Sequence, residues 1–266
     1  MNVQIGFRLR FGIPAPTPML VLLQVRPSGY AFARPENLLI APDLPVEHFI
    51  DAFGNAARRF VAPAGQLELT SDGVVAVSGQ PDGVAAHATQ HAITALPIET
   101  LPHLVASRYC EIDRLSEFAW QRFGNGPTGW LRVQAVCDFV HQHISFGYAY
   151  ARPTKSAYDV FVERQGVCRD FAHLGIALCR CLGIPARYAT GYLGDIGVPA
   201  DPAPMDFSAW FEVFLSGTWH TFDARHNRPR IGRVVMAYGR DAADTALTTS
   251  FGPTLLQGFE VWSREA

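Results

Sequence analysis

The stretch Gly166-Val167-Cys168-Arg169-Asp170-Phe171-Ala172-His173-Leu174 decides the fold of this chain and locates its chemistry. Gly166 interrupts the preceding segment, and apolar residues then recur at the spacing of an amphipathic helix: Phe171, Leu174, Ala177, Leu178 and Leu182. Gly183 and Pro185 are typical of a helix end. The sequence therefore predicts a helix that begins near Cys168 and ends before Gly183.

Cys168 would lie at the N-terminus of this helix, where a cysteine can become reactive. Unpaired backbone N–H groups and the helix dipole stabilise a thiolate there, and Arg169 adds positive charge. Cys179 and Cys181 lie late in the same helix, so we interpret them as structural thiols. Position alone leaves a nucleophile and a buried structural thiol equally open at Cys168.

The composition is that of an ordered globular protein. The chain has 266 residues, of which 48% are hydrophobic and 17% charged, and it can form one large domain or two smaller ones. The formal net charge is −2, and its 21 arginines are scattered beside a single lysine, Lys155. No global field directs such a chain to nucleic acid or to a membrane, so we expect neither as a partner.

The N-terminal half contains no targeting signal that the sequence reveals. Met1–Arg8 lacks the long apolar core of a signal peptide. The most apolar run, Met19–Val25, is too short to cross a bilayer. These observations favour a cytoplasmic protein.

The cysteines and acidic residues do not suggest a metal site. The five cysteines are odd in number and do not form a disulfide framework: Cys110, Cys137, Cys168, Cys179 and Cys181. No spacing of Cys and His resembles a closed zinc site. Asp195, Asp201 and Asp206 lack the ligand spacing of a calcium loop. We therefore expect neither a metal nor another cofactor.

Two regions of different pattern follow one another along the chain. In the first, apolar residues alternate with mostly polar ones, which predicts a strand with one buried face: Val3, Ile5, Phe7, Leu9 and Phe11. Turn signals between further short apolar runs favour a small antiparallel β-sandwich. Later, helical spacing joins Trp130, Val133, Cys137, Val140 and Ile144. We expect a β-rich domain over residues 1–100 and a mixed domain over 101–266.

A hairpin is predicted after the Cys168 helix. The apolar runs 209–215 and 218–223 flank Ser216-Gly217, which suits a two-residue loop. In that register Leu215 pairs with Thr218. Ser208 and Asp223 then become diagonal neighbours on one face of the sheet.

Four motifs, in this order and spacing, resemble the bacterial transglutaminase-like cysteine proteases. They read Gly-Val-Cys-Arg-Asp-Phe-Ala, Gly-Ile-Pro-Ala-Arg-Tyr with Thr-Gly-Tyr, Ala-Trp-Phe-Glu-Val, and Trp-His-Thr-Phe-Asp. The resemblance covers about residues 105–255, and the β-rich N-terminal region is similar to the one that accompanies this domain in bacteria. It implies an α+β, papain-like core in which a Cys-bearing helix packs on an antiparallel sheet bearing His and Asp. It also implies a peptide or protein substrate that is processed through a thioester.

The resemblance places the nucleophile at Cys168 and the orienting acid at Asp223. The histidine of the family immediately precedes Ala-Trp, and this position is Ser208 here. A serine hydroxyl does not take up a proton near neutral pH and cannot be the base. His220 falls on the opposite face from Asp223 by strand parity.

His226 and His173 are the remaining candidates for the base. His226 has the wrong parity if its strand continues, but Asn227 and Pro229 indicate that the strand ends, and a turn could bring His226 back over the site. His173 lies five residues after Cys168, roughly 140° around the helix. We interpret it as a packed or hydrogen-bonded helix residue.

A run of arginines follows Asp223: Arg225, Arg228, Arg230 and Arg233. The run could bind an acidic substrate. We expect instead that these residues pair with Asp241, Asp244 and neighbouring acidic residues.

Two functions remain open. The first is an enzyme in which Cys168 performs acyl transfer or amide hydrolysis through a thioester. The second is a pseudoenzyme, impaired by Ser208, that binds peptides or proteins without turnover. The sequence does not indicate an oligomeric state.

Overall fold

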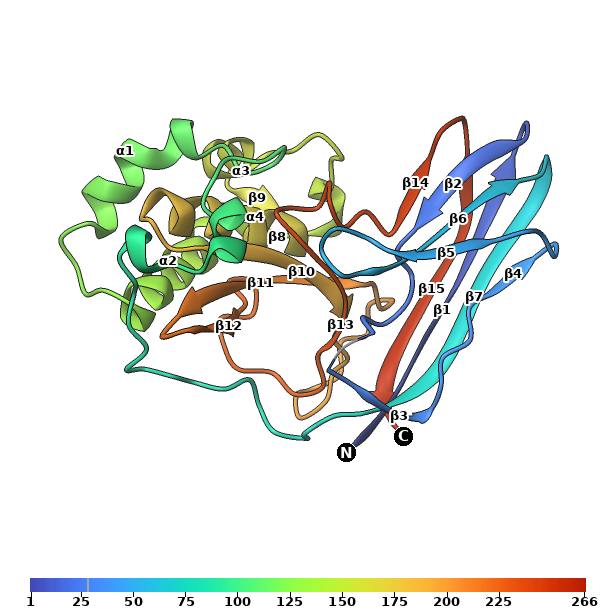
Figure 1. Cartoon of the computed structure of the whole chain (residues 1–266), viewed down its shortest axis with the longest axis horizontal. Helices are drawn as coiled ribbons and strands as arrows, with labels where there is room; N and C mark the ends of the chain where they lie inside the picture. The colour runs from blue at the N-terminus through green and yellow to red at the C-terminus, as the bar shows by residue number, and fades with distance from the viewer. Residues whose placement is uncertain (28) are drawn as a thin grey trace.

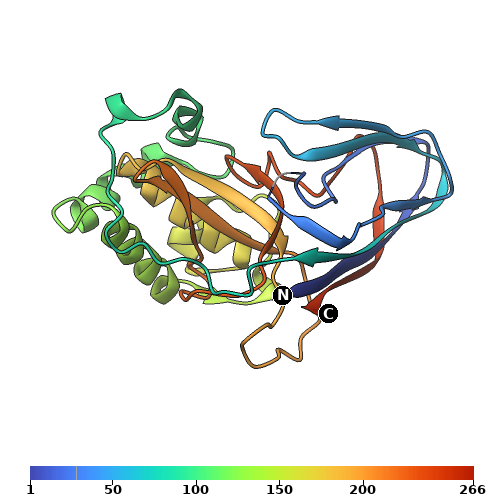
Figure 2. The ribbon, with the colours of Figure 1, turned by 60° about the horizontal axis from the view of Figure 1, so that its bottom comes forward.

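The computed structural model describes residues 1–27 and 29–266, which form a strand-rich part and a mixed α/β part side by side (Figure 1). The two termini lie close together where the two parts meet (Figure 2), and the Ala266 N–H donates to the Asn2 carbonyl at 3.1 Å. The chain therefore begins and ends at the junction. Among the described residues, none of the helices combines the length and apolar character needed to cross a membrane.

The strand-rich part consists of two sheets with the orders β15-β1-β7-β3, where β4 also pairs with β7, and β14-β2-β6-β5. The strands are β1 (Asn2–Ile13), β2 (Thr17–Val21), β3 (Ala31–Arg34), β4 (Leu39–Ala41), β5 (Glu47–Ile50), β6 (Ala56–Ala62), β7 (Gly65–Ala76), β14 (Thr248–Ser250) and β15 (Leu255–Glu265). The alternation in β1 is confirmed, since its apolar residues from Val3 to Phe11 are at most 5% exposed. The core of this part lies between its two sheets.

The C-terminal strands belong to these sheets, which differs from the expected division into residues 1–100 and 101–266. β14 pairs with β2, and β15 runs antiparallel to β1 from the Val3–Glu265 pair to the Gly12–Leu255 pair. β1 thereby gains a hydrogen-bonded neighbour on each side, because β7 covers its other edge. The chain leaves the strand-rich part after β7 and returns to it at β14.

The mixed part contains a four-stranded antiparallel sheet of order β12-β11-β10-β13 and a short parallel pair, β8 with β9. Its helices are α1 (Ile112–Phe123), α2 (Trp130–His143), α3 (Ala157–Glu163) and α4 (Cys168–Cys181), with the short helices η1 (Ile93–Ala95), η2 (Ile98–His103) and η3 (Tyr148–Tyr150). Its strands are β8 (Ser145–Phe146), β9 (Gln165–Gly166), β10 (Ala186–Tyr192), β11 (Ser208–Leu215), β12 (Thr218–Phe222) and β13 (Val234–Gly239).

Helix α4 is the centre of the mixed part. It begins at Cys168, as predicted, and packs on β10 and β11, while α1, α2 and α3 pack against it. Every residue from Asp170 to Arg180 is buried. Gly175 lets the helix approach the sheet, because a Cβ atom there would lie 2.7 Å from Cε1 of Phe211 on β11. This close contact brings α4 against the sheet that contains β11.

The predicted hairpin register is also confirmed. Leu215 pairs with Thr218 and Phe214 with Trp219, and the β12 ladder ends at Phe222, one residue before Asp223. On its other edge β11 pairs with β10, where Ser208 lies opposite Gly191. Ser208 is thus the first residue of a strand with neighbours on both sides.

The contact of α4 with β11 leads to a prediction about stability. We expect Gly175→Val to lower the free energy of unfolding by about 1–3 kcal/mol, because the added side chain overpacks a filled interface. Gly83→Val is the matched control, since a Cβ atom at Gly83 meets nothing within 4 Å. Urea denaturation of both variants measures the effect, and equal midpoints would contradict the close packing.

Candidate active site

The residues around Cys168 form a compact cap on α4. The Asp170 carboxylate accepts the N–H of Val167 at 2.9 Å and receives the Arg169 guanidinium at 3.1 Å. A Cβ atom on Gly166 would lie 2.7 Å from this carboxylate, so the position requires glycine. The Gly-Val-Cys-Arg-Asp motif therefore holds Cys168 as the first residue of the helix.

The Cys168 thiol is half-buried and lies against the start of β11. Burial raises its pKa to about 11, although the positive charge of Arg225 and a hydrogen bond from the Ala209 N–H favour the thiolate. The charge of Asp206 acts in the opposite direction. With this pKa, about one molecule in ten thousand carries a thiolate at pH 7. A nucleophilic attack by Cys168 near neutral pH therefore needs a base.

Ser208 lies next to Ala209 and close to the thiol, at the position where the resemblance expects histidine. It is 6% exposed, and its carbonyl accepts a hydrogen bond from the Thr190 hydroxyl at 3.1 Å. Its own hydroxyl has no hydrogen-bond partner among residues 1–27 and 29–266. Ser208 therefore offers no group that could take the proton of the nucleophile.

A turn after β12 brings His226 back onto Asp223. One carboxylate oxygen of Asp223 accepts the backbone N–H groups of Arg225 and His226, at 3.0 and 3.1 Å. The other oxygen lies 2.8 Å from Nδ1 of the His226 ring. Since a carboxylate accepts hydrogen bonds, Nδ1 carries the proton and Nε2 is left as an acceptor. A turn was one of the two possibilities that the sequence left open for His226, and in the structure a turn brings His226 against Asp223.

Asp223 is held ionised by Arg233, a pairing that the sequence did not reveal. Burial alone would raise the pKa of Asp223, but the Arg233 guanidinium at 2.9 Å and the hydrogen bonds from His226 hold it well below its usual range. Arg233 also pairs with Asp82 at 2.8 Å, and Asp82 lies in the segment that joins the two parts. No local pattern links Asp82 to Arg233, which lies 151 positions later, so sequence reasoning missed this pair.

Two arginines of the run pair with acidic residues, as expected, but the prediction of Asp241 and Asp244 as their partners was wrong. Arg230 contacts Asp195 at 3.4 Å, and Arg233 pairs with Asp82 and Asp223. The expected acids have other partners, because Asp241 accepts the backbone N–H of Tyr109 and Asp244 pairs with Arg240. The turn after Asp223 directs the arginines toward the junction of the two parts instead of toward the residues after β13.

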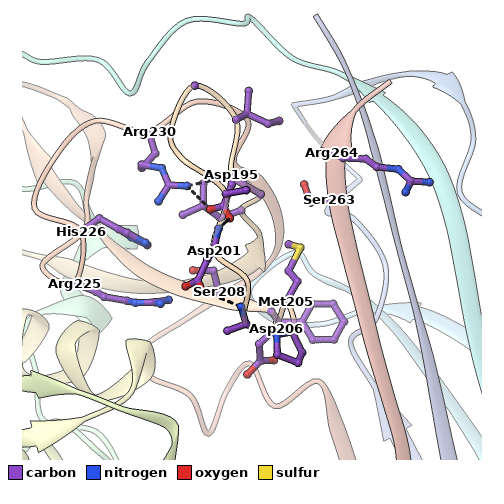
Figure 3. Close-up of a pocket in the computed structure, with 18 of the residues that line it drawn as sticks. Asp195, Asp201, Met205, Asp206, Ser208, Arg225, His226, Arg230, Ser263 and Arg264 are labelled. Atoms are coloured by element: carbon purple, nitrogen blue, oxygen red, sulfur yellow. Dashed lines mark hydrogen bonds and ion pairs between the residues drawn. The ribbon is translucent and has the colours of Figure 1, made fainter.

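A cavity of about 420 Å³ lies at this junction. Its walls come from the loop between β10 and β11, from the turn with Arg225 and His226, and from the end of β15. Figure 3 shows His226 and Arg225 pointing into it from one side and Ser263 lying on the opposite side. Ser208 also lines the cavity, whereas Cys168 is not among its lining residues and lies beside Ser208, against Ala209.

The other histidines considered above have structural partners. His173 is buried, its Nε2 accepts the N–H of Ala242 at 3.1 Å, and its ring stacks on Tyr109 with 5.0 Å between centroids. Burial lowers the pKa of His173 well below its usual range, so it stays neutral. This confirms its interpretation as a packed residue. The ring of His220 packs against the ring of Trp130, with 5.6 Å between their centroids. Within the described ranges, no cluster of three His, Cys, Asp or Glu side chains could hold a metal ion.

Comparison with known proteins agrees with the fold and the motifs. The model of the transglutaminase-like superfamily matches residues 120–224, which include Cys168, Ser208 and Asp223. A crystal structure of a candidate cysteine protease from Cytophaga hutchinsonii is 31% identical, with a TM-score of 0.89 over 99% of this chain and 90% of that one.

Two mycobacterial proteins without an assigned function are also similar. Rv2569c of Mycobacterium tuberculosis is 33% identical over 217 residues, which cover 73% of this chain and 68% of that protein. ML0607 of Mycobacterium leprae is 23% identical over 203 residues, or 74% of this chain and 73% of that protein. Together with the Cys-bearing helix on its antiparallel sheet, these matches show that the chain belongs to the transglutaminase-like superfamily.

Proposed function

We propose that this protein is a cysteine-dependent acyltransferase or amide hydrolase in which Cys168 is the nucleophile and His226 is the general base. The observation that carries the proposal is the 2.8 Å contact between Nδ1 of His226 and Asp223, in a histidine that lines the same cavity as Ser208. His226 would supply the imidazole that is absent at Ser208. The similarity to the Cytophaga hutchinsonii protein supports peptide or protein amides as substrates.

The reaction would proceed through a thioester. Nε2 of His226 takes the proton of the Cys168 thiol as the sulfur attacks the carbonyl carbon, and N–H groups of the first turn of α4 stabilise the oxyanion. The tetrahedral intermediate breaks its C–N bond, and the leaving amine takes the proton from His226. Water or a second amine then attacks the thioester, loses a proton to His226, and releases the sulfur as a thiol.

Asp223 would orient the imidazole and stabilise its protonated form during these steps. Arg233 keeps Asp223 ionised, and Asp82 holds Arg233 in place. An orienting acid that is fully charged keeps the His226 proton on Nδ1, so that Nε2 faces the reaction.

A binding module without turnover is the second candidate, and one observation favours it. The raised pKa of Cys168, about 11, keeps the sulfur as a thiol, and Ser208 beside it cannot remove the proton. In that case the wild type would bind peptides without turnover, and Ser208→His would gain amidase or transamidase activity.

We predict that iodoacetamide alkylates Cys168 faster than any other cysteine near pH 7.5. Cys181 is the internal comparison, because it is also half-buried and burial raises its pKa to about 11 as well. Cys137 and Cys179 are buried, and burial raises the pKa of each further. Faster labelling of Cys168 than of Cys181 therefore reports a base close to the sulfur. Peptide mass spectrometry after timed labelling gives the rates, and equal slow rates would count against a catalytic thiol.

We further predict that His226→Gln lowers turnover at least about 100-fold, the usual contribution of a general base. Suitable assays are hydrolysis of fluorescent casein and transfer of monodansylcadaverine to dimethylcasein. His220→Gln is the matched control on β12 and should retain activity. Turnover that depends on Cys168 but survives His226→Gln would refute the assignment of the base. Absence of wild-type turnover, with activity gained in Ser208→His, would support the binding module.

A further inference from the structure

Three arginines line the cavity, and two of them are engaged by neighbouring groups. Arg230 donates to the Gly194 carbonyl at 3.0 Å and contacts Asp195 at 3.4 Å. Arg264 donates to the side-chain oxygen of Gln4 at 3.0 and 3.1 Å. Across residues 1–27 and 29–266, the guanidinium of Arg225 has neither a hydrogen bond nor an ion pair, so its donors are available.

Arg225 nevertheless has a fixed position. Its guanidinium carbon lies 3.8 Å from the ring centroid of Phe146, and its backbone N–H is bound to Asp223. A guanidinium over an aromatic face is attracted to the ring while its in-plane N–H groups stay free. Figure 3 shows this side chain extending into the cavity. The arrangement presents an ordered cation to a ligand.

Two buried hydroxyls in the same cavity also lack partners. Ser208 and Ser263 are 6% and 7% exposed, and neither hydroxyl has a hydrogen bond within the described part of the chain. Buried polar groups in folded proteins are nearly always hydrogen-bonded. Among the described residues, the cavity thus has unpaired polar groups in its walls, and the Arg225 cation suits an anionic ligand, since a carboxylate forms paired hydrogen bonds with arginine.

The guanidinium of Arg225 lies near the beginning of α4. It sits over the ring of Phe146, and Phe146 pairs with Gly166, two residues before Cys168. The charge of Arg225 accordingly favours the thiolate of Cys168. Asp206 also faces Arg225, but no ion pair within 4.0 Å joins them in the described structure, so a ligand carboxylate can take the closer position. A negative group bound by Arg225 would therefore lie near the bond under attack.

We infer that Arg225 binds a carboxylate of the substrate, so that the preferred substrates are peptides with a free carboxylate close to the scissile amide. This inference rests on the proposed function of Cys168 as the nucleophile. It makes Arg225 a specificity-determining residue. Of the arginine run that could bind an acidic substrate, Arg225 is then the residue that does so.

Iodoacetate and iodoacetamide test the inference without a known substrate. Both alkylate a thiolate with loss of iodide. They differ only in that iodoacetate carries a carboxylate where iodoacetamide carries an amide. Arg225 also affects the fraction of Cys168 that is thiolate. This fraction enters both rates equally, so the ratio of the two rates does not depend on it. At pH 9, where accessible thiols react, we expect Arg225→Gln to lower the iodoacetate-to-iodoacetamide ratio about tenfold, the size of one charge-assisted hydrogen bond. Arg225→Lys should retain part of the preference.

Arg264→Gln removes the same charge from the same cavity and serves as the control. Because Gln4 engages Arg264, its loss should change the ratio less than about twofold, the scale of a screened surface charge. A second arm uses N-acetyl-triglycine and its C-terminal amide to protect Cys168 from iodoacetamide. The acid should protect the wild type and not Arg225→Gln, whereas the amide should protect neither.

The outcomes separate this inference from the proposed function. An equal ratio in the wild type and Arg225→Gln, or equal protection by the acid and the amide, would overturn the carboxylate site even where Cys168 is reactive. Slow labelling of Cys168 by iodoacetamide relative to Cys181 would count against the nucleophile, while the ratio at pH 9 would still report on Arg225.

Discussion

The candidate site depends on the hydrogen bonds and the ion pair that the buried carboxylate of Asp223 makes. A buried charge without partners is very costly, so the chain around Asp223 has to supply them. It does so with two backbone N–H groups of the following turn, the His226 ring and the Arg233 guanidinium. These contacts end β12, reverse the chain, and place His226 and Arg225 at the cavity. The link from Arg233 to Asp82 then ties this turn to the segment between the two parts.

The strand-rich part contributes to the site and is more than an attached domain. β15 returns from the mixed part, pairs with β1, and forms one wall of the cavity with its last residues. Its contribution includes the unpartnered hydroxyl of Ser263. The cavity beside the start of β11 therefore depends on the packing of two regions that are far apart in sequence. Within the mixed part, the close contact at Gly175 holds α4 against β11, the strand that begins at Ser208.

Local features were predictable from the sequence, whereas long-range pairings were not. The helix at Cys168, the alternation in β1 and the hairpin register from Phe211 to Phe222 depend on spacing and turn residues that a short window contains. The return of β15 to β1 and the pairing of Asp82 with Arg233 join residues that no local pattern connects. The position of His226 depended on where β12 ends, and the sequence left that choice open because Asn227 and Pro229 only indicate a break.

Single-turnover acylation by p-nitrophenyl acetate tests most directly whether His226 serves the Cys168 sulfur. The sulfur would displace p-nitrophenolate and retain the acetyl group as a thioester, which intact-protein and peptide mass spectrometry locate. The account predicts a burst of about one equivalent of p-nitrophenolate in the wild type, acetylation at Cys168, and a burst at least about 100-fold slower in His226→Gln. A burst of equal rate in the two proteins, or acetylation at a residue other than Cys168, would contradict it.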